Sequence, residues 1–384
     1  MSATWVAQRQ LLRWYADNHR MLPWRLAPGA GLTDAYAQVL AELMLQQTRV
    51  DTVIDYFNRW LARWPDWQTL AAAPLDEVLA QWTGLGYYNR ARNLHKTAHI
   101  VTTELGGVLP ADPTVLARLP GIGPYTAGAV LSIAFGQPVA LVDGNVARVL
   151  SRWYALRHDP MTGVGKTQVW QWAHEQLATE GPAHADPASW NQALMELGAT
   201  LCSPKTPDCQ RCPVAQHCLA YAQGVQHTIP PPRQRTTVVD VQAHYLVVRA
   251  RAQDQQMVGD GAQDLVLLGR RPDRGRWAGL WEPLGAEGPD AAALLALWAR
   301  DRGVTHLQPL PALVHILSHR RYLVASQSGF WAGQPENLAL PDVSNLAYVG
   351  CRWQSVAAAL GQTSGLSRLG QRLLQSLFGP QLLL

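Results

Sequence analysis

Residues 119–128 read Leu-Pro-Gly-Ile-Gly-Pro-Tyr-Thr-Ala-Gly. The two glycines Gly121 and Gly123 predict a tight turn directly before an apolar helix over 127–135. Backbone N–H groups exposed at such a turn can hold a phosphate group without any charged side chain. An ordinary loop has the same pattern, so these residues alone leave both interpretations open.

The chain around this turn divides into two regions of different periodicity. Up to about residue 222 the pattern is mainly helical, and one helix has its apolar stripe at Tyr36, Val39, Leu40, Leu43 and Met44. Three prolines follow Ile229, and such a run can neither continue a helix nor enter a sheet. We therefore expect a helical domain over 1–223, a linker over 224–238 and a second domain over 239–384.

The second region has the alternation typical of strands. Strands are predicted at 239–248, 265–268, 313–317 and 322–325, and helices at 290–302 and 367–378. This mixture predicts a small α/β or α+β domain.

Composition excludes some classes of protein. No apolar run approaches the length of a membrane span, and the first 25 residues lack a signal-peptide core, so we expect a cytoplasmic protein that does not bind membranes. The net charge is +4, but the first 225 residues hold 17 basic and 17 acidic side chains. Nucleic-acid binding must therefore be argued from local arrangement.

Four of the five cysteines are tightly grouped. Six, two and five residues separate Cys202, Cys209, Cys212 and Cys218. Grouped thiols in a reducing compartment indicate a metal centre. The spacing alone leaves two alternatives open: structural zinc, and a 4Fe-4S cluster, which suits a set with only one short pair. Cys351 stands apart and is predicted to be structural.

Two carboxylates could work as a pair. Glu42 lies on the amphipathic helix about 130° from the centre of its apolar stripe, at about 100° per residue, where it faces either solvent or a cleft. Asp143 starts an Asp-Gly-Asn segment and could simply cap a helix. Cleavage of a glycosidic bond needs one acid for the leaving group and one carboxylate for the sugar cation.

Five motifs in this order resemble the A/G-specific adenine DNA glycosylases, of the helix-hairpin-helix, endonuclease III-like superfamily. They are Leu40-Ala-Glu-Leu-Met-Leu-Gln-Gln-Thr48, Trp82-Thr-Gly-Leu-Gly-Tyr-Tyr88, the glycine turn, Leu141-Val-Asp-Gly-Asn145 and the four cysteines. The resemblance runs from about Trp14 to Cys218. It implies a 4Fe-4S cluster on the cysteines and a turn that binds DNA phosphates.

The resemblance also implies roles for single residues. Glu42 would protonate adenine at N7, and Asp143 would stabilise or trap the sugar cation, with Tyr125 and Asn145 beside them. The DNA and the flipped base would meet the residues Arg25, Gln46, Gln47, Thr48, Leu85, Tyr87 and Gln192. Without the resemblance, Tyr87 and Tyr88 would be read as a half-buried aromatic pair.

Tyr125 indicates which of two related activities to expect. Glycosylase-lyases of the superfamily place a lysine at this position to form a Schiff base with the sugar, and a phenol cannot do so. A glycosylase that leaves an abasic site is therefore predicted.

The second domain resembles the Nudix-like, α+β domain that this family adds for lesion recognition. Arg300 and Asp301 replace the paired glutamates that a working Nudix hydrolase uses for metal. Ser318 and His319 are the predicted readers of 8-oxoguanine, with Leu317 where the family has an aromatic residue. The expected partner is double-stranded DNA with 8-oxoguanine:A or G:A mispairs, bound by a monomer at the nucleoid.

The sequence disfavours three alternative functions. An endonuclease III-like lyase is disfavoured by Tyr125 and by the added domain. A nucleotide-pool hydrolase is disfavoured by the degraded glutamate box. A non-catalytic, cluster-bearing DNA-binding protein is disfavoured because Glu42 and Asp143 are both present.

Overall fold

The computed structural model describes residues 3–27, 30–178, 180–232, 237–251, 264–317, 319–331, 346–361 and 365–379. Contacts divide the chain into two compact units. The first comprises Met1–Ala73 and Arg90–Gln234, and the second comprises Pro74–Asn89 and Arg235–Leu384. In the described part of the chain, no helix is long and apolar enough to span a membrane.

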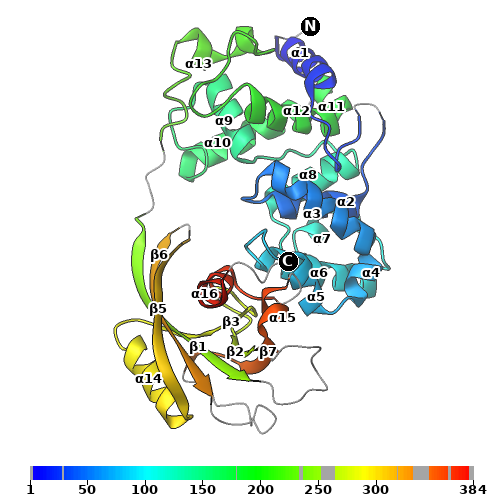
Figure 1. Cartoon of the computed structure of the whole chain (residues 1–384). Helices are drawn as coiled ribbons and strands as arrows, with labels where there is room; N and C mark the ends of the chain where they lie inside the picture. The colour runs from blue at the N-terminus through cyan, green and yellow to red at the C-terminus, as the bar shows by residue number, and fades with distance from the viewer. Residues whose placement is uncertain are drawn as a thin grey trace. The chain divides into compact units, whose positions relative to one another are not determined.

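The first unit is helical (Figure 1). Its elements are α1 (Ala3–Asn18), α2 (Ala35–Leu45), α3 (Val50–Arg63), α4 (Trp67–Ala72), α6 (Asn89–Thr103), α7 (Pro113–Leu116), α8 (Pro124–Ala129), the π-helix η1 (Val130–Ala134), α9 (Gly144–Trp153), α10 (Gly163–Ala178), α11 (Pro182–Ala185), α12 (Pro187–Thr200), the 3₁₀-helix η2 (Ala215–His217) and α13 (Leu219–Ala222). Helix α5 (Leu75–Gln81) groups with the second unit.

One hydrophobic core joins α1, α9, α10 and α12. Leu11, Leu150, Trp190 and Leu194 are buried in it. Helix α12 begins where Asp186 accepts a hydrogen bond from the backbone N–H of Ser189 at 3.0 Å and where a proline occupies the first turn. Burying this helix fixes the positions of the polar residues that it carries.

The helix predicted over 127–135 starts earlier in the structure. Pro124 is the first residue of α8. A proline fits there because the N–H groups of the first helical turn have no acceptor within the helix, so the missing N–H costs no hydrogen bond. The predicted run is also not one regular α-helix, since Val130–Ala134 form the π-helix η1.

The second unit contains a mixed seven-stranded sheet of β1 (Val239–Arg251), β2 (Asp264–Arg270), β3 (Trp281–Glu282), β4 (Leu284–Glu287), β5 (Val304–Ile316), β6 (Arg320–Trp331) and β7 (Gly350–Ser355). The strand order is β3-β2-β1-β6-β5, with β4 paired to β1 and β7 paired to β2. Only the β1–β6 pair is parallel among the described strands. The strands and helices predicted for this region are present.

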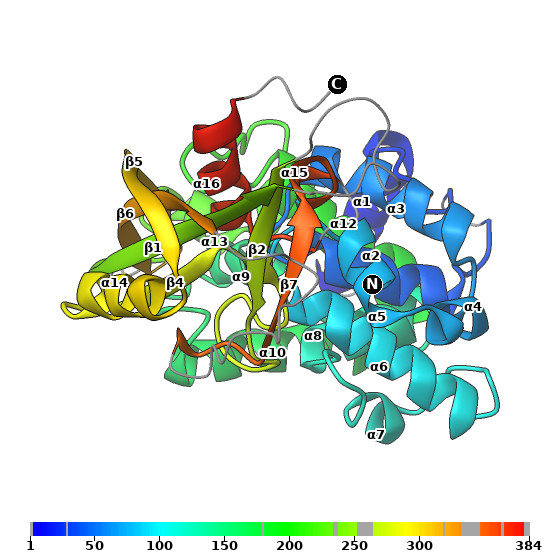
Figure 2. The same ribbon diagram turned by 60° about the horizontal axis from the view of Figure 1, so that its bottom comes forward.

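Helices cover both faces of this sheet (Figure 2). Leu246 and Val248 of β1 pack with α14 (Ala291–Asp301), whereas Val247 between them faces the side of α15 (Val356–Leu360) and α16 (Arg368–Phe378). This alternation follows from the two-residue period of a strand. Cys351 is buried in the α14 core, in agreement with the structural role predicted for it.

Candidate active site

Glu42 is buried inside the helical unit. Its side chain is on α2, whose start is capped by Asp34, and the residue is 4 % exposed. Gln38, one turn earlier, donates to one carboxylate oxygen at 2.7 Å, and the Tyr125 hydroxyl donates to the other at 2.5 Å. The solvent-facing alternative for Glu42 is therefore wrong, and the cleft-facing alternative is right.

Asp143 caps a helix and also faces the site. It precedes α9, and its Oδ1 accepts from the backbone N–H of Val146 at 2.7 Å. The Asn145 amide donates to its Oδ2 at 3.0 Å. The helix-cap interpretation of Asp143 is therefore confirmed, and the residue also lines the pocket described below.

Two glycines allow the backbone segments around Asp143 to meet. A Cβ on Gly128 of α8 would lie 2.2 Å from the carbonyl oxygen of Ala140, just before Asp143. A Cβ on Gly198 of α12 would lie 2.6 Å from Cβ of Asn145. Neither position has room for a side chain, so these close approaches fix Asp143 relative to α8 and α12.

The predicted catalytic residues share one pocket. It has a volume of about 1310 Å³, open solvent at its mouth included. Among its lining residues are Glu42, Asp143, Tyr125 and Asn145, the predicted base-contacting residues Arg25, Gln46, Gln47 and Thr48, and also Arg20, Leu22, Trp24 and Met195. Side chains from α2, α8, α9 and α12 are thus brought to one cavity.

The pocket raises the pKa of both carboxyl groups. Burial, reinforced by the nearby Asp143 and opposed by the hydrogen bonds and by Arg25, raises the pKa of Glu42 to about 7. Burial also raises the pKa of Asp143 above its usual range, against the hydrogen bonds that it accepts. Burial and the neighbouring carboxylates raise the pKa of Tyr125, which stays a hydrogen-bond donor to Glu42.

The turn after α2 is fixed by a residue that sequence reasoning missed. Arg90 Nη1 donates to the carbonyl oxygens of Leu43, Met44 and Gln46 at 2.7, 2.9 and 2.6 Å. Within this turn Gln47 is exposed and has a φ of 56°. Tyr87, which is 52 % exposed, has a φ of 48°. Both residues predicted to wedge into the base stack thus have a strained left-handed backbone.

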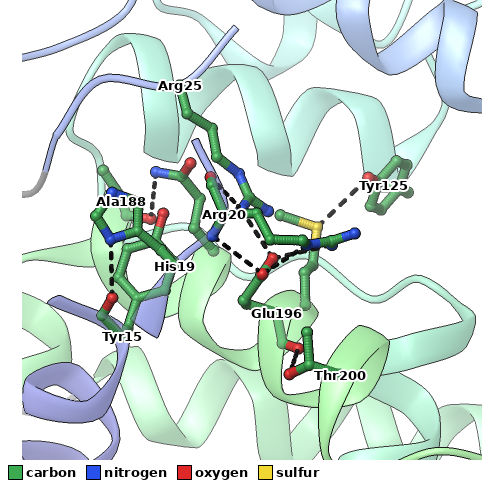
Figure 3. A network of polar contacts seen from close by, with 10 residues as sticks. Tyr15, His19, Arg20, Arg25, Tyr125, Ala188, Glu196 and Thr200 are labelled. Atoms are coloured by element: carbon green, nitrogen blue, oxygen red, sulfur yellow. Dashed lines mark hydrogen bonds and ion pairs between the residues drawn. The ribbon is translucent and has the colours of Figure 1, made fainter. Parts of the chain in front are cut away.

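The ion-paired group at the pocket wall was also missed. Figure 3 shows Arg20 and Arg25 converging on Glu196 of α12, with Arg20 Nε and Arg25 Nη1 each 2.7 Å from a carboxylate oxygen. Arg20 and Glu196 are 176 residues apart, so no local pattern in the sequence could reveal the pair.

Other predicted residues do not line this pocket. Gln192 lines a separate hollow of about 670 Å³ with Tyr15 and Thr33, and it donates to the backbone of Ala188 at 3.3 Å. Leu85 is buried at 5 % exposure. His319 is exposed at the turn between β5 and β6.

The predicted lesion-reading turn is described only in part. Ser318 lies outside the described residues. Leu317, where the family has an aromatic residue, is half-buried against the core that contains Tyr322.

The amides of the glycine turn are available. Gly121 and Gly123 are both exposed, and Gly121 has a φ of 82°. Among the described residues, neither backbone N–H has a hydrogen-bond acceptor.

The four predicted metal-binding cysteines line one cavity of about 430 Å³ with apolar walls that include Val149, Trp153 and Leu197. Arg152 reaches the cavity, with Nη1 3.3 Å from the Cys202 sulfur and 2.7 Å from the Ser203 carbonyl oxygen. In the described part of the chain, no three His, Cys, Asp or Glu side chains form a group that could hold a single metal ion.

Arg148 connects this cavity with the carboxylate site. Its Nε donates to the Cys202 carbonyl oxygen at 2.8 Å, and its Nη2 donates to the Asn145 side chain at 2.8 Å and to the Gly198 carbonyl oxygen at 2.7 Å. The cysteine loop therefore helps to orient the amide that contacts Asp143.

Several known proteins are similar in sequence to this chain. The family model of the HhH-GPD superfamily of base excision DNA repair proteins matches residues 40–174. Adenine DNA glycosylase of Rattus norvegicus is 36% identical over 92% of this chain and 76% of its own length. The protein of that name from Mus musculus is 39% identical over 80% of this chain and 67% of its own.

A fungal relative extends this similarity. Adenine DNA glycosylase of Schizosaccharomyces pombe is 32% identical over 72% of this chain and 68% of its own length. The family expected from the motifs is confirmed, as is a helical glycosylase domain followed by an α+β domain. The chain belongs to the adenine DNA glycosylases, N-glycosidic hydrolases that remove adenine from DNA in base excision repair.

Proposed function

We propose that this glycosylase removes adenine paired with 8-oxoguanine or guanine, using Glu42 as the general acid and Asp143 as the carboxylate that stabilises the sugar cation. One observation carries the proposal. The two carboxyl groups come from different helices and line one pocket together with Tyr125 and Asn145. Glycosidic cleavage requires such a pair.

The two carboxyl groups have different surroundings, which suits different roles. With a pKa of about 7, Glu42 keeps its proton in a large fraction of molecules near neutral pH and can transfer it to the departing base. Asp143 accepts from the Val146 N–H and from Asn145, which keeps its carboxylate oriented. Stabilisation of the sugar cation needs an oriented, ionised carboxylate.

Tyr125 supports base removal without strand cleavage. Its hydroxyl is bound to Glu42 at 2.5 Å and cannot form a Schiff base with the sugar. In our proposal Tyr125 holds Glu42 in place, and water, not an amine of the enzyme, completes the reaction.

DNA binding follows from the backbone as much as from side chains. The N–H groups of Gly121 and Gly123 would hold phosphates of the strand, while Gln47 and Tyr87 would fill the space left by the flipped adenine. The pocket residues Arg25, Gln46 and Thr48 would contact the base. We assign Leu85 and Gln192 supporting roles, because both are buried and neither lines this pocket.

We further propose a 4Fe-4S cluster on Cys202, Cys209, Cys212 and Cys218. The four thiols line one cavity, and the Arg152 guanidinium beside Cys202 would compensate negative charge on a thiolate–iron group. When bound, the cluster would serve as a structural cross-link of the loop, with no part in bond cleavage.

Lesion recognition is assigned to the second domain. Ser318 and His319 would read 8-oxoguanine in the turn that joins β5 and β6. The domains are proposed to be 1–223 and 239–384, joined by the 224–238 linker, and the enzyme would act as a monomer on nucleoid DNA.

The test is Glu42→Gln, measured for adenine release and for binding of an 8-oxoguanine:A duplex. We expect release to fall by at least about 10²-fold, the scale of general acid catalysis, with binding unchanged. Release within a few-fold of the parent would refute the role of Glu42. Borohydride should trap no covalent complex with the parent enzyme, and efficient trapping would contradict the assignment of Tyr125.

A further inference from the structure

Glu196 is a buried carboxylate with two cationic partners. Its side chain is fully buried on α12, and Arg20 Nε and Arg25 Nη1 each lie 2.7 Å from one of its oxygens. Arg20 also donates to it through Nη2 at 3.0 Å (Figure 3). Burial alone raises the pKa of Glu196, but the two arginines outweigh burial and hold it below its usual range. The three side chains therefore carry one net positive charge.

This charge sits beside the catalytic carboxylates. Arg20 and Arg25 line the same pocket as Glu42, and the Arg25 side chain is only 9 % exposed, so solvent screens it weakly. The titratable and charged groups that act on Glu42 are Tyr125 from α8, Asp143 from the start of α9, and Arg25. Tyr15 from α1 interacts electrostatically with Arg25, with Glu196 and with Asp186 at the start of α12.

We propose that Glu196 is a positioning residue that holds Arg20 and Arg25 on the pocket wall and limits the positive charge near Glu42 to one. The inference rests on the proposed role of Glu42 as proton donor. It differs from a purely structural ion pair because it concerns the proton on Glu42. Glu196 itself contacts no reacting atom in this proposal.

The direction of the effect follows from the charge. In Glu196→Gln, two uncompensated guanidinium groups remain, which favours ionised Glu42 and releases its proton at lower pH. Arg25→Met leaves Arg20 paired with Glu196 and no net charge, so Glu42 should keep its proton to higher pH. The double variant again carries one net positive charge, from Arg20 alone.

The experiment measures single-turnover adenine release by the full chain on an 8-oxoguanine:A duplex across pH. In Glu196→Gln the alkaline limb of the profile should move to lower pH, because the lost carboxylate leaves the positive charge of the arginines uncompensated. In Arg25→Met it should move to higher pH, and in the double variant it should lie between the positions of the two single variants. Glu175→Gln is the matched control, because Glu175 is exposed on α10 in the same unit, and its profile should stay in place.

Two outcomes would overturn the proposal. One is a slower Glu196→Gln enzyme whose alkaline limb has not moved, which is what a purely structural ion pair predicts. The other outcome concerns Arg25→Met, which provides the test if Glu196→Gln does not fold. An alkaline limb of Arg25→Met at the same pH as that of the parent would reject the proposal. Glu42→Gln is measured in parallel. If this variant still releases adenine, the proposed role of Glu42 is wrong. If it releases no adenine but the alkaline limbs of the Glu196 and Arg25 variants have not moved, only the proposal for Glu196 is wrong.

Discussion

Glu42→Gln should raise the stability of the protein at alkaline pH while it removes the activity. In the folded chain, burial raises the pKa of Glu42 from 4.5 to about 7, so the native state keeps a proton that the unfolded chain has lost. Between these two values the native state binds more protons, and stability therefore falls as pH rises through that window. Above pH 7 the buried Glu42 lowers the free energy of unfolding by the full amount, and below pH 4.5 it does not lower it.

The magnitude follows from the same values. A pKa raised from 4.5 to about 7 corresponds to about 3 kcal/mol in the free energy of unfolding, at about 1.4 kcal/mol per pH unit. Glutamine is never charged and avoids this penalty, but it loses about 1 kcal/mol with one of the hydrogen bonds from Gln38 and Tyr125. The variant should thus gain about 2 kcal/mol at pH 8, or about 6 °C in Tm for a unit of this size.

The assay is thermal unfolding of the full chain, followed by circular dichroism at pH 5 and pH 8, for the parent, Glu42→Gln and the control Glu175→Gln. At pH 5 the gain from Glu42→Gln should vanish, because little of the penalty is present there. The control should show no pH-dependent difference from the parent, since its carboxylate is exposed. A Glu42→Gln variant that is no more stabilised at pH 8 than at pH 5 would refute a neutral, buried Glu42.

Three further predictions concern other parts of the fold. Gly128→Ala should destabilise the protein by about 3 kcal/mol in urea unfolding, because its Cβ would lie 2.2 Å from the Ala140 carbonyl oxygen; an unchanged midpoint would show that the two segments separate easily. Cys212→Ser should lose iron in elemental analysis, and full iron content would contradict its role as a ligand. Replacing both Ser318 and His319 by Ala should reduce the preference for 8-oxoguanine over guanine opposite adenine, and an unchanged ratio of release rates would reject their assignment.

Local patterns predicted the elements well where apolar side chains are buried. The residues of β1 alternate between the helices on the two faces of the sheet, and one side of α14 packs on the sheet, so the sequence shows both patterns directly. The first half of β5 was missed because this edge strand is mostly exposed and includes Pro309, leaving no apolar alternation to detect. The helix α8 starts at Pro124, earlier than the predicted Ala127, because the pattern Gly-Ile-Gly-Pro is typical of a turn and Pro124 nevertheless fits the first helical turn.

The sequence by itself determined which chemical groups this enzyme has and in what order: a glutamate on a helix, a glycine turn, an Asp-Gly-Asn segment and four cysteines. It could not decide whether Glu42 faces solvent, because helical periodicity gives the direction of the side chain around the helix but not which segment packs against that side. Only the tertiary structure places Tyr125 against Glu42, 83 residues away, and Glu196 against Arg20 and Arg25. Contacts between distant segments depend on how the helices pack. A single contact of this kind produces no repeating pattern in the sequence of either segment.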